Sequence, residues 1–153
     1  MLKLNKMTDY AVICLGILSR KPDYPMSAKE LSKETVLTLY TVQKILKIIV
    51  SKSDIISAHR GALGGYILNR NSSEISVVEI IEALEGPITL TSCVDNSENL
   101  CESSDICFLG GKWNKVNNII RKTLNDISLN DLLNFDNSFA SRGEKEVVVN
   151  TIN

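Results

Sequence analysis

The sequence predicts a mostly α-helical fold that carries one small β-hairpin. Three observations lead to this prediction. Apolar residues recur every three or four positions in several separate segments, which is the period of a helix with one buried face. Two Ser-x-x-Glu capping boxes mark helix starts, and a glycine-rich tip separates two runs of β-prone residues. A chain of 153 residues suits one compact domain, or a small domain with an appended element.

The first predicted helix covers residues 5–20. Its predicted apolar face consists of Tyr10, Ile13, Cys14, Ile17 and Leu18. We expect Cys14 to be a small buried hydrophobic residue of this face rather than a reactive thiol. Pro22 and Pro25 then break the helix.

Two further helices follow in close succession. Ser27 and Glu30 form a capping box that opens a short helix over 27–34, and after a tight turn Thr38 caps a helix that ends near Lys52. The predicted buried face of this second helix is Val42, Ile45, Leu46 and Ile49. Its other face carries Tyr40, Thr41, Gln43, Lys44 and Lys47. Two short helices joined by a turn, with the second polar and basic outward, are typical of a helix-turn-helix.

A β-hairpin is predicted directly after these helices. Its strands are the β-prone runs 55–59 and 65–69, and its tip is rich in glycine, with Arg60 at the base of the tip. A hairpin in this place is the wing of a winged helix-turn-helix. Glycines let such a tip approach a phosphate backbone closely, and Arg60 can neutralise a phosphate or enter a minor groove. The alternative is an ordinary surface hairpin.

Charge is distributed unevenly along the chain. Residues 1–70 have eleven Lys and Arg against five Asp and Glu, whereas residues 71–153 have six against thirteen. A basic front half on a nearly neutral chain predicts a domain that faces a polyanion, although an uneven surface without a partner is the alternative. With a helix-turn-helix and a wing in this half, the expected polyanion is double-stranded DNA. The candidate DNA-binding residues are Thr38, Tyr40, Thr41, Gln43, Lys44, Lys47, His59, Arg60, Gly61 and Gly64.

The second half contains two more capped segments and a long helix. Ser76 and Glu79 form a capping box, and the helix that they open ends at Gly86-Pro87. A helix is predicted over 112–127, and Ser128 caps one further short turn. The apolar seam of the long helix is Trp113, Val116, Ile120, Leu124 and Ile127. This seam predicts pairing with a twin helix in a homodimer, and packing within the same chain is the alternative.

Three of the four cysteines lie within fifteen residues, as Cys93, Cys101 and Cys107 with the spacing C-x7-C-x5-C. No apolar run approaches the roughly 20 residues that span a bilayer, and no signal peptide is recognisable, so we expect a cytoplasmic protein without a membrane segment. Thiols stay reduced in that compartment. The cluster of cysteines therefore indicates a metal or cluster site or a redox switch, and a chance grouping without chemistry is the alternative. Zinc is disfavoured, because it prefers closer C-x-x-C pairs.

The predicted organisation has four parts. Residues 1–86 form a winged helix-turn-helix DNA-binding domain, and residues 87–111 form a cysteine-rich cluster-binding loop. Residues 112–133 form the C-terminal dimerisation helix. Residues 134–153 show no sustained period, and we expect them to be a flexible tail.

This order of elements resembles the Rrf family of bacterial winged-helix regulators over roughly residues 1–133. Within that family the chain is most similar to the IscR-like regulators and, among these, to the SUF-type regulators of iron–sulfur assembly. The segments that carry the resemblance are LTLYTVQKILK, SAHRGALGGYIL, SVVEIIEALEGPITLTSC and WNKVNNIIRKTLNDISLNDLL. The resemblance implies a homodimer with a [2Fe–2S] cluster in each subunit, held by the thiolates of Cys93, Cys101 and Cys107.

The chain departs from the IscR pattern at two places. The first cysteine spacing is longer, and Gly110 stands where the IscR group has a histidine ligand. The only histidine, His59, lies in the wing and is expected to face solvent or a phosphate. In one relative an acidic residue near the start of the first helix ligates the cluster of the partner subunit, and Asp9 matches that place. The alternative for Asp9 is a carboxylate stabilised by the helix dipole.

The resemblance implies a DNA-binding transcriptional regulator, a repressor of iron–sulfur cluster assembly genes, that senses through the cluster. One alternative is a thiol-based redox or nitric-oxide responsive regulator without a cluster. Another is an iron–sulfur electron carrier that does not bind DNA. An enzyme is not expected, because the sequence has neither a nucleotide-binding fingerprint nor a recognisable catalytic dyad.

Overall fold

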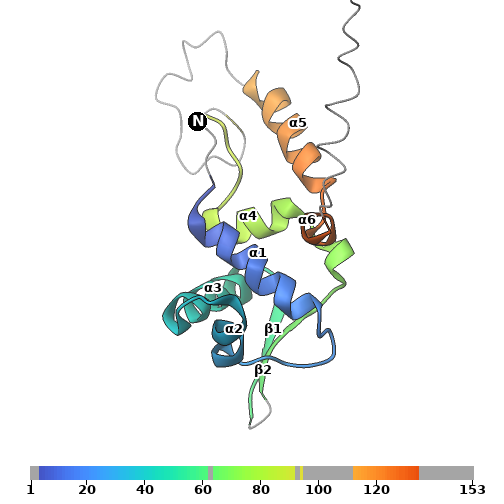
Figure 1. The fold of residues 1–153 in the computed structure, drawn as a ribbon. Coiled ribbons are helices and arrows are strands. Elements are labelled where there is room, and N and C mark those ends of the chain that lie inside the picture. The colour runs from blue at the N-terminus through green and yellow to red at the C-terminus, as the bar shows by residue number, and fades with distance from the viewer. Residues whose placement is uncertain (1–3, 62–63, 92–93, 95–111, 135–153) are drawn as a thin grey trace, which may run out of the picture.

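The computed structural model of the chain describes residues 4–61, 64–91, 94 and 112–134. Helices and one hairpin follow one another in these ranges, which confirms the predicted mostly helical architecture (Figure 1). The elements are α1 Lys6–Ser19, α2 Ala28–Thr35, α3 Leu39–Lys52, β1 Ile56–His59, β2 Gly65–Leu68, the 3-10 helix η1 Ser72–Glu74, α4 Val77–Glu85, α5 Trp113–Asn125 and α6 Leu129–Leu133. The three clustered cysteines, Gly110 and the predicted tail from residue 135 onward lie outside the described residues.

Side-chain caps begin α2, α3, α4 and α6 at the predicted positions. The Ser27 hydroxyl accepts a hydrogen bond from the backbone N–H of Glu30 at 3.2 Å, and the Glu30 carboxylate accepts one from the backbone of Ser27 at 2.8 Å. Ser76 with Glu79 repeats this capping box at α4. A further box formed by Asn71 and Glu74 opens η1, an element that the periodicity did not predict because it has only three residues.

One core joins α1, α2, α3 and the hairpin. The predicted inward face of α3 is confirmed, since Val42, Ile45, Leu46 and Ile49 are fully buried. The predicted face of α1 is partly wrong. Ile13 was expected inside, but its side chain is 44% exposed, whereas Ala11 and Leu15 are buried beside Cys14. Small residues of α1 such as Ala11 and Gly16 let neighbouring elements pack closely against that side of the helix. Leu133 of α6 fills the space above Gly16.

The hairpin is fixed to the helix-turn-helix by a third backbone segment. β1 and β2 are antiparallel, with Ile56 opposite Leu68. Met26, just before α2, exchanges two backbone hydrogen bonds with Tyr66 at 3.0 and 2.8 Å. A side chain at Gly65 would bring its Cβ within 2.6 Å of the Met26 backbone. The glycine therefore permits this contact, which holds the base of the wing against the segment that enters α2.

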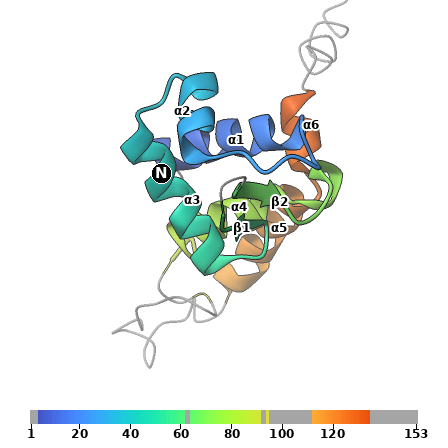
Figure 2. The same ribbon diagram turned by 90° about the horizontal axis from the view of Figure 1, so that it is seen from below.

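The end of the described chain returns to the N-terminal core. Leu129 of α6 is fully buried in that core, and its backbone N–H donates to the carbonyl of Ile75 at 2.8 Å. The backbone N–H of Val77 donates to Ile127 at 2.9 Å. α6 lies beside α1, on the side away from α2 (Figure 2). None of the helices in the described ranges is long and apolar enough to cross a membrane.

Val36 provides a test of the turn between α2 and α3. It ends α2 in the left-handed conformation, with φ 61° and ψ 13°, and its side chain is 93% exposed. A β-branched residue is strained there, whereas glycine adopts this conformation without a Cβ clash. Val36→Gly should therefore raise the free energy of unfolding by about 0.5–1 kcal/mol in urea denaturation. Val50→Gly, inside α3, should instead lower it by about 1 kcal/mol, and a fall for both variants would contradict the predicted strain.

Candidate functional site

The outward face of α3 is polar and basic, as the sequence predicts. Its exposed polar and basic side chains include Tyr40, Gln43, Lys44 and Lys47, and the apolar Leu39 and Val50 are exposed at its two ends. Tyr40 is 75% exposed in the first turn of the helix, which leaves its ring free of the core. Thr38 is the N-cap of α3, and its hydroxyl accepts from the backbone N–H of Thr41 at 3.2 Å. The Thr41 hydroxyl lies 2.8 Å from that of Thr38. These two threonines therefore have a structural task in addition to any contact with a ligand.

The wing presents its basic end to solvent. His59, Arg60 and Gly61 are exposed, and the two residues at the very tip, 62 and 63, lie outside the described residues. Gly61 has φ +121°, and the backbone N–H of Gly64 donates to its carbonyl at 3.0 Å. A Cβ at Gly64 would lie 2.4 Å from the carbonyl oxygen of His59. Both glycines are thus required by the turn itself, a reason different from the close approach to phosphate that the sequence suggested.

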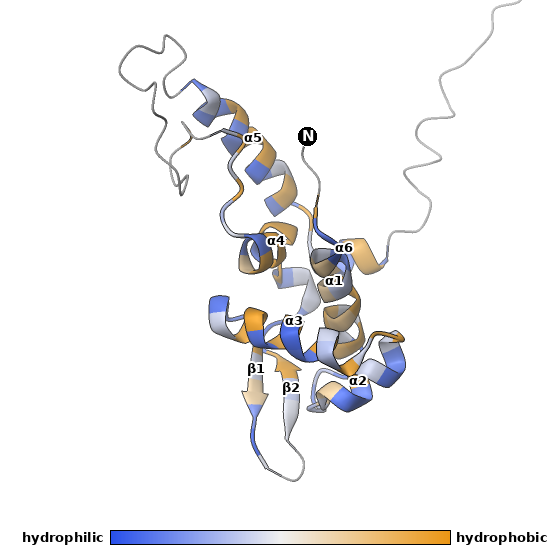
Figure 3. Ribbon diagram, turned by 90° about the vertical axis from the view of Figure 1, so that its left-hand side faces the viewer, coloured by the Kyte–Doolittle hydropathy of each residue, from blue (hydrophilic) through white to orange (hydrophobic). Residues whose placement is uncertain are grey.

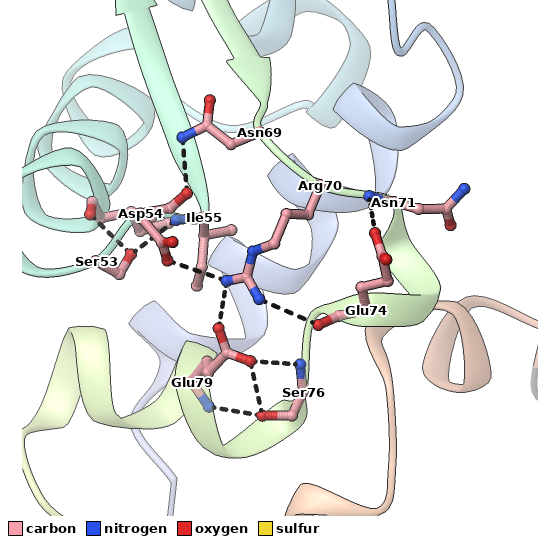
Figure 4. A network of polar contacts seen from close by, with 10 residues as sticks. Ser53, Asp54, Ile55, Asn69, Arg70, Asn71, Glu74, Ser76 and Glu79 are labelled. Carbon is pink, nitrogen blue, oxygen red and sulfur yellow. Dashed lines mark hydrogen bonds and ion pairs between the residues drawn. The ribbon is translucent and has the colours of Figure 1, made fainter.

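Arg70 joins the base of the wing to α4 (Figure 4). Its Nη2 donates to the carboxylates of Asp54 at 3.0 Å and Glu79 at 2.5 Å, and its Nη1 donates to the carbonyl of Glu74 at 3.3 Å. Burial acts to raise the pKa of the Glu79 carboxyl, but the hydrogen bonds from Arg70 and Ser76 outweigh it and lower that pKa. The ion pair is therefore present at neutral pH. Sequence reasoning missed Arg70, because nothing in its local pattern identifies its partners.

The segment that leads toward Cys93 is held between α4 and α5. Asn117 of α5 is only 2% exposed, and its side-chain amide bonds to the segment twice. It accepts from the N–H of Leu90 at 3.0 Å and donates to the carbonyl of Ile88 at 2.9 Å. Arg121 forms a two-pronged pair with Glu82 of α4 at 3.0 and 2.9 Å. The chain thus enters the cysteine-rich segment from a fixed start beside α5.

The start of α1 is tied to the other end of α4. The Glu85 carboxylate accepts from the backbone N–H of Asn5 at 2.8 Å and from the hydroxyl of Thr8. Asp9, the candidate fourth ligand, is exposed in this first turn of α1. Among the residues that the structure describes, no three His, Cys, Asp or Glu gather as a metal site would require. The structure therefore places Asp9 but not the cysteines that it would join.

Cys14 is a hydrophobic residue of the core, as predicted. Its side chain is fully buried in α1, and this burial raises the pKa of its thiol to about 11. A thiol with such a pKa is almost entirely protonated at neutral pH, whereas the thiolate is the form that attacks or binds metal. Cys14 is therefore not a candidate ligand.

The apolar seam of α5 is divided between two environments. Leu124 and the following Ile127 pack against a small cluster in α4 that includes Val78 and Ile81. Toward its start α5 projects beyond the other helices, beside the segment that contains Ile88 and Leu90 (Figures 1 and 3). The exposed apolar side chains there are Trp113, Val116 and Ile119. Leu124 and Ile127 of the predicted seam thus pack within the chain, and Ile120 is half-buried. Trp113 and Val116 of the seam are exposed together with Ile119, which the seam did not include, and pairing through them stays a prediction.

These features define the class of the protein. A helix-turn-helix, a wing with an exposed arginine and a basic face on the second helix are the parts of a winged-helix DNA-binding transcriptional regulator. The sequence profile of the Rrf2 family, described as "Iron-dependent Transcriptional regulator", matches residues 4–134. The chain belongs to the Rrf2 family, whose members regulate transcription and are not enzymes.

Similarity to individual proteins agrees with this family. The HTH-type transcriptional regulator IscR of Photorhabdus laumondii is 27% identical over 134 residues, which cover 87% of this chain and 80% of that protein. The structure of T. potens IscR is 26% identical with a TM-score of 0.58 and covers 86% of each chain. The fold is also that of CymR, the global cysteine regulator of B. subtilis, with a TM-score of 0.65 at 23% identity over 89% of this chain and 99% of that one.

Proposed function

We propose that the chain is a cytoplasmic, homodimeric repressor of iron–sulfur assembly genes that responds to a [2Fe–2S] cluster. The observation that carries this proposal is the spacing of Cys93, Cys101 and Cys107, which lie between a winged helix-turn-helix and α5 in a chain of the Rrf2 family. Three thiols in a segment this polar and acidic are not expected to be core residues. Ligation is therefore the use that their spacing favours.

The chain offers three soft ligands and one hard one. The thiolates of Cys93, Cys101 and Cys107 would hold the cluster, since thiolates are the usual ligands of such groups. The carboxylate of the partner's Asp9 is the proposed fourth ligand. A carboxylate oxygen binds iron more weakly than thiolate or imidazole, so the bound cluster would be labile and sensitive to its supply. The fraction of protein that holds the cluster would then vary with the supply of iron–sulfur clusters in the cell.

DNA contact is assigned to α3 and the wing. Lys44 and Lys47 would displace counterions from the phosphates, which provides affinity without sequence preference. Tyr40, Thr41 and Gln43 lie near the start of the helix, where side chains reach base edges in the major groove. Arg60 would set the register on the backbone or in the minor groove. Thr38, His59, Gly61 and Gly64 support these contacts at the helix start and in the wing.

Dimerisation is assigned to α5. Trp113, Val116 and Ile119 are exposed apolar side chains in the first half of this helix, which projects beyond the other helices. Apolar area removed from water contributes roughly 25 cal/mol per Å², so pairing with the same surface of a second copy would be favourable. Two copies would present two α3 helices to a two-fold operator.

Charge explains how cluster loss would weaken DNA binding. The cysteine segment carries Asp95, Glu98, Glu102 and Asp105. Without the cluster these carboxylates would repel DNA or alter the spacing of the two α3 helices. Cluster occupancy would thereby shift the population that binds the operator.

Anaerobic reconstitution tests the proposal. Iron and sulfide analysis of the purified protein should find two of each per subunit, and the reconstituted form should bind its operator more tightly than the apo form. A protein without iron and sulfide whose DNA binding responds to thiol oxidation or nitric oxide would instead be the thiol-based regulator. A protein that holds the cluster but shows no salt-dependent DNA binding would be the electron carrier.

Two substitutions on α3 separate affinity from sequence preference. Lys44→Ala should weaken binding about equally on all sequences and lower the slope of log K against log salt by about 1 for each bound subunit. Gln43→Ala should relax preference at one base position, by about 1–3 kcal/mol, because Gln can pair with an adenine edge through two hydrogen bonds. Titration of a panel of duplexes measures both. An unchanged preference in Gln43→Ala would remove Gln43 from the proposed base readers.

A further inference from the structure

We propose that Arg70 is a positioning residue, which holds the wing at a fixed angle to α3 so that both reach DNA together. The proposal rests on the proposed role of the wing. Arg70 lies at the base of the hairpin (Figure 4), whereas the exposed Arg60 and Gly61 follow the end of β1 at the other end of the wing. Its effect on DNA binding would therefore pass through Arg60.

The guanidinium of Arg70 connects three segments. Arg70 follows β2, which ends at Leu68, and Asp54 precedes β1, which begins at Ile56. Nη2 of Arg70 lies 3.0 Å from the Asp54 carboxylate and 2.5 Å from that of Glu79 in α4. One side chain thus joins the strand that enters the wing, the strand that leaves it and the helix behind it.

Further hydrogen bonds join the two strands at the base of the wing. Asn69 donates from its side chain to the carbonyl of Asp54 at 2.7 Å and from its backbone to Ile55 at 3.0 Å. α3 ends at Lys52, and the N–H of Ser53 still bonds to Ile49 at 2.9 Å. Asp54 is therefore two residues beyond the end of α3, at the joint between that helix and the wing.

The carboxylate of Glu79 is held in place by the N-terminal cap of α4. One of its carboxylate oxygens accepts from the backbone and hydroxyl of Ser76, both at 3.2 Å, and the other accepts from Arg70. The carboxylate cannot turn to follow the wing without breaking the capping box of α4. The Nε of Arg70 is buried and has no hydrogen-bond partner within the described ranges. The guanidinium is thus held by its Nη atoms alone, in one orientation.

A purely electrostatic role and a positioning role predict opposite changes in DNA affinity when Asp54 or Glu79 loses its charge. Asp54 and Glu79 are negative, so removing either charge should strengthen binding to a polyanion if only long-range charge matters. A role in stability alone predicts no change in the affinity of the folded protein. Positioning predicts weaker binding, because Arg60 would no longer be held at its phosphate.

The test compares Glu79→Gln and Asp54→Asn with wild type. The full-length reconstituted protein is titrated, at several salt concentrations, with a duplex that wild type has selected from a random library. Loss of one phosphate contact should weaken binding about fivefold per wing at 0.15 M salt and lower the salt slope by about 1 per wing. Glu34→Gln is the matched control, since Glu34 pairs with Lys21 at 3.0 Å on the surface and the charge change is the same. It should leave the affinity equal or slightly higher.

A double-mutant cycle with Arg60→Ala distinguishes the possible failures. If Arg70 acts through Arg60, then Glu79→Gln should have no further effect in the Arg60→Ala background. Should Arg60→Ala alone change neither affinity nor salt slope, the wing has no role in DNA binding and that part of the proposed function is wrong. If Arg60→Ala weakens binding while Glu79→Gln and Asp54→Asn do not, the positioning role alone is wrong.

Folding is checked on the same samples by urea denaturation. Asp54 is the safer of the two sites, because its side chain is 81% exposed and its substitution removes one surface ion pair, which contributes about 0–1 kcal/mol. The affinity of Asp54→Asn therefore decides the question even if Glu79→Gln is too unstable to assay.

Discussion

Replacing Cys93, Cys101 or Cys107 by Ala is expected to abolish the absorption of the reconstituted cluster. Each substitution removes one of three thiolates, and the chain has no spare thiol that could replace it, because Cys14 is fully buried with a pKa of about 11. Operator affinity should fall to that of the apo protein in the same variants. Anaerobic absorption spectra, iron and sulfide analysis, and DNA titration measure these effects together.

Cys14→Ala is the matched control for these variants. It removes a thiol as well, yet it should keep the absorption and the iron content, since Cys14 contributes only packing in α1. If all three variants of the clustered cysteines retain the wild-type spectrum, the cluster assignment is wrong. Asp9→Ala examines the fourth ligand, and we expect a cluster that forms but is lost faster than in wild type.

Leu129→Ala should lower the free energy of unfolding by about 2–5 kcal/mol, although the residue lies more than 40 positions beyond α4. Its side chain is fully buried in the core formed by α1, α3 and the hairpin, so truncation would leave a cavity there. The backbone hydrogen bond from Leu129 to Ile75, with the one from Val77 to Ile127, keeps α6 in place and limits collapse around the cavity. Urea denaturation measures the loss.

Leu133→Ala in the same short helix serves as the comparison. Leu133 is 41% exposed and lies over Gly16, so its truncation should lower the free energy of unfolding less, by about 1 kcal/mol. Equal and small losses for both variants would mean that α6 does not belong to the core. A large loss for Leu129→Ala would mean that the predicted DNA-binding domain, residues 1–86, needs this later helix for its stability.

Local signals in the sequence predicted the elements well. The boxes at Ser27 and Ser76 fix helix starts because each satisfies orphan N–H groups within four residues, and the buried face of α3 follows from its regular spacing. The face of α1 was misplaced because small residues such as Ala11 and Gly16 allow close packing that hydrophobicity alone does not indicate. Periodicity describes one helix at a time, whereas the neighbours decide which side is inside.

Contacts between distant segments could not be predicted in this way. Asn117 looks like a polar surface residue in the sequence, yet it is buried against a segment 29 positions away. Arg70 and Arg121 look like ordinary surface cations, and only the fold supplies their carboxylates. The candidate DNA-binding residues were found because they share one helix face and one turn. Arg70, Arg121 and Asn117, which connect the helices and the wing, have no common spacing in the sequence that would identify them.

The three glutamates of α4 limit where this chain can be joined to part of a relative in a chimera. Glu79 binds Arg70 at the wing, Glu82 binds Arg121 of α5, and Glu85 binds the start of α1. A chimera that joined the N-terminal part of this chain to the cysteine segment of a relative at residue 86 would keep all three carboxylates but replace Arg121. Such a hybrid should fold poorly unless α4 and its partners are transferred as a set. Evolution within the family should likewise exchange these pairs together.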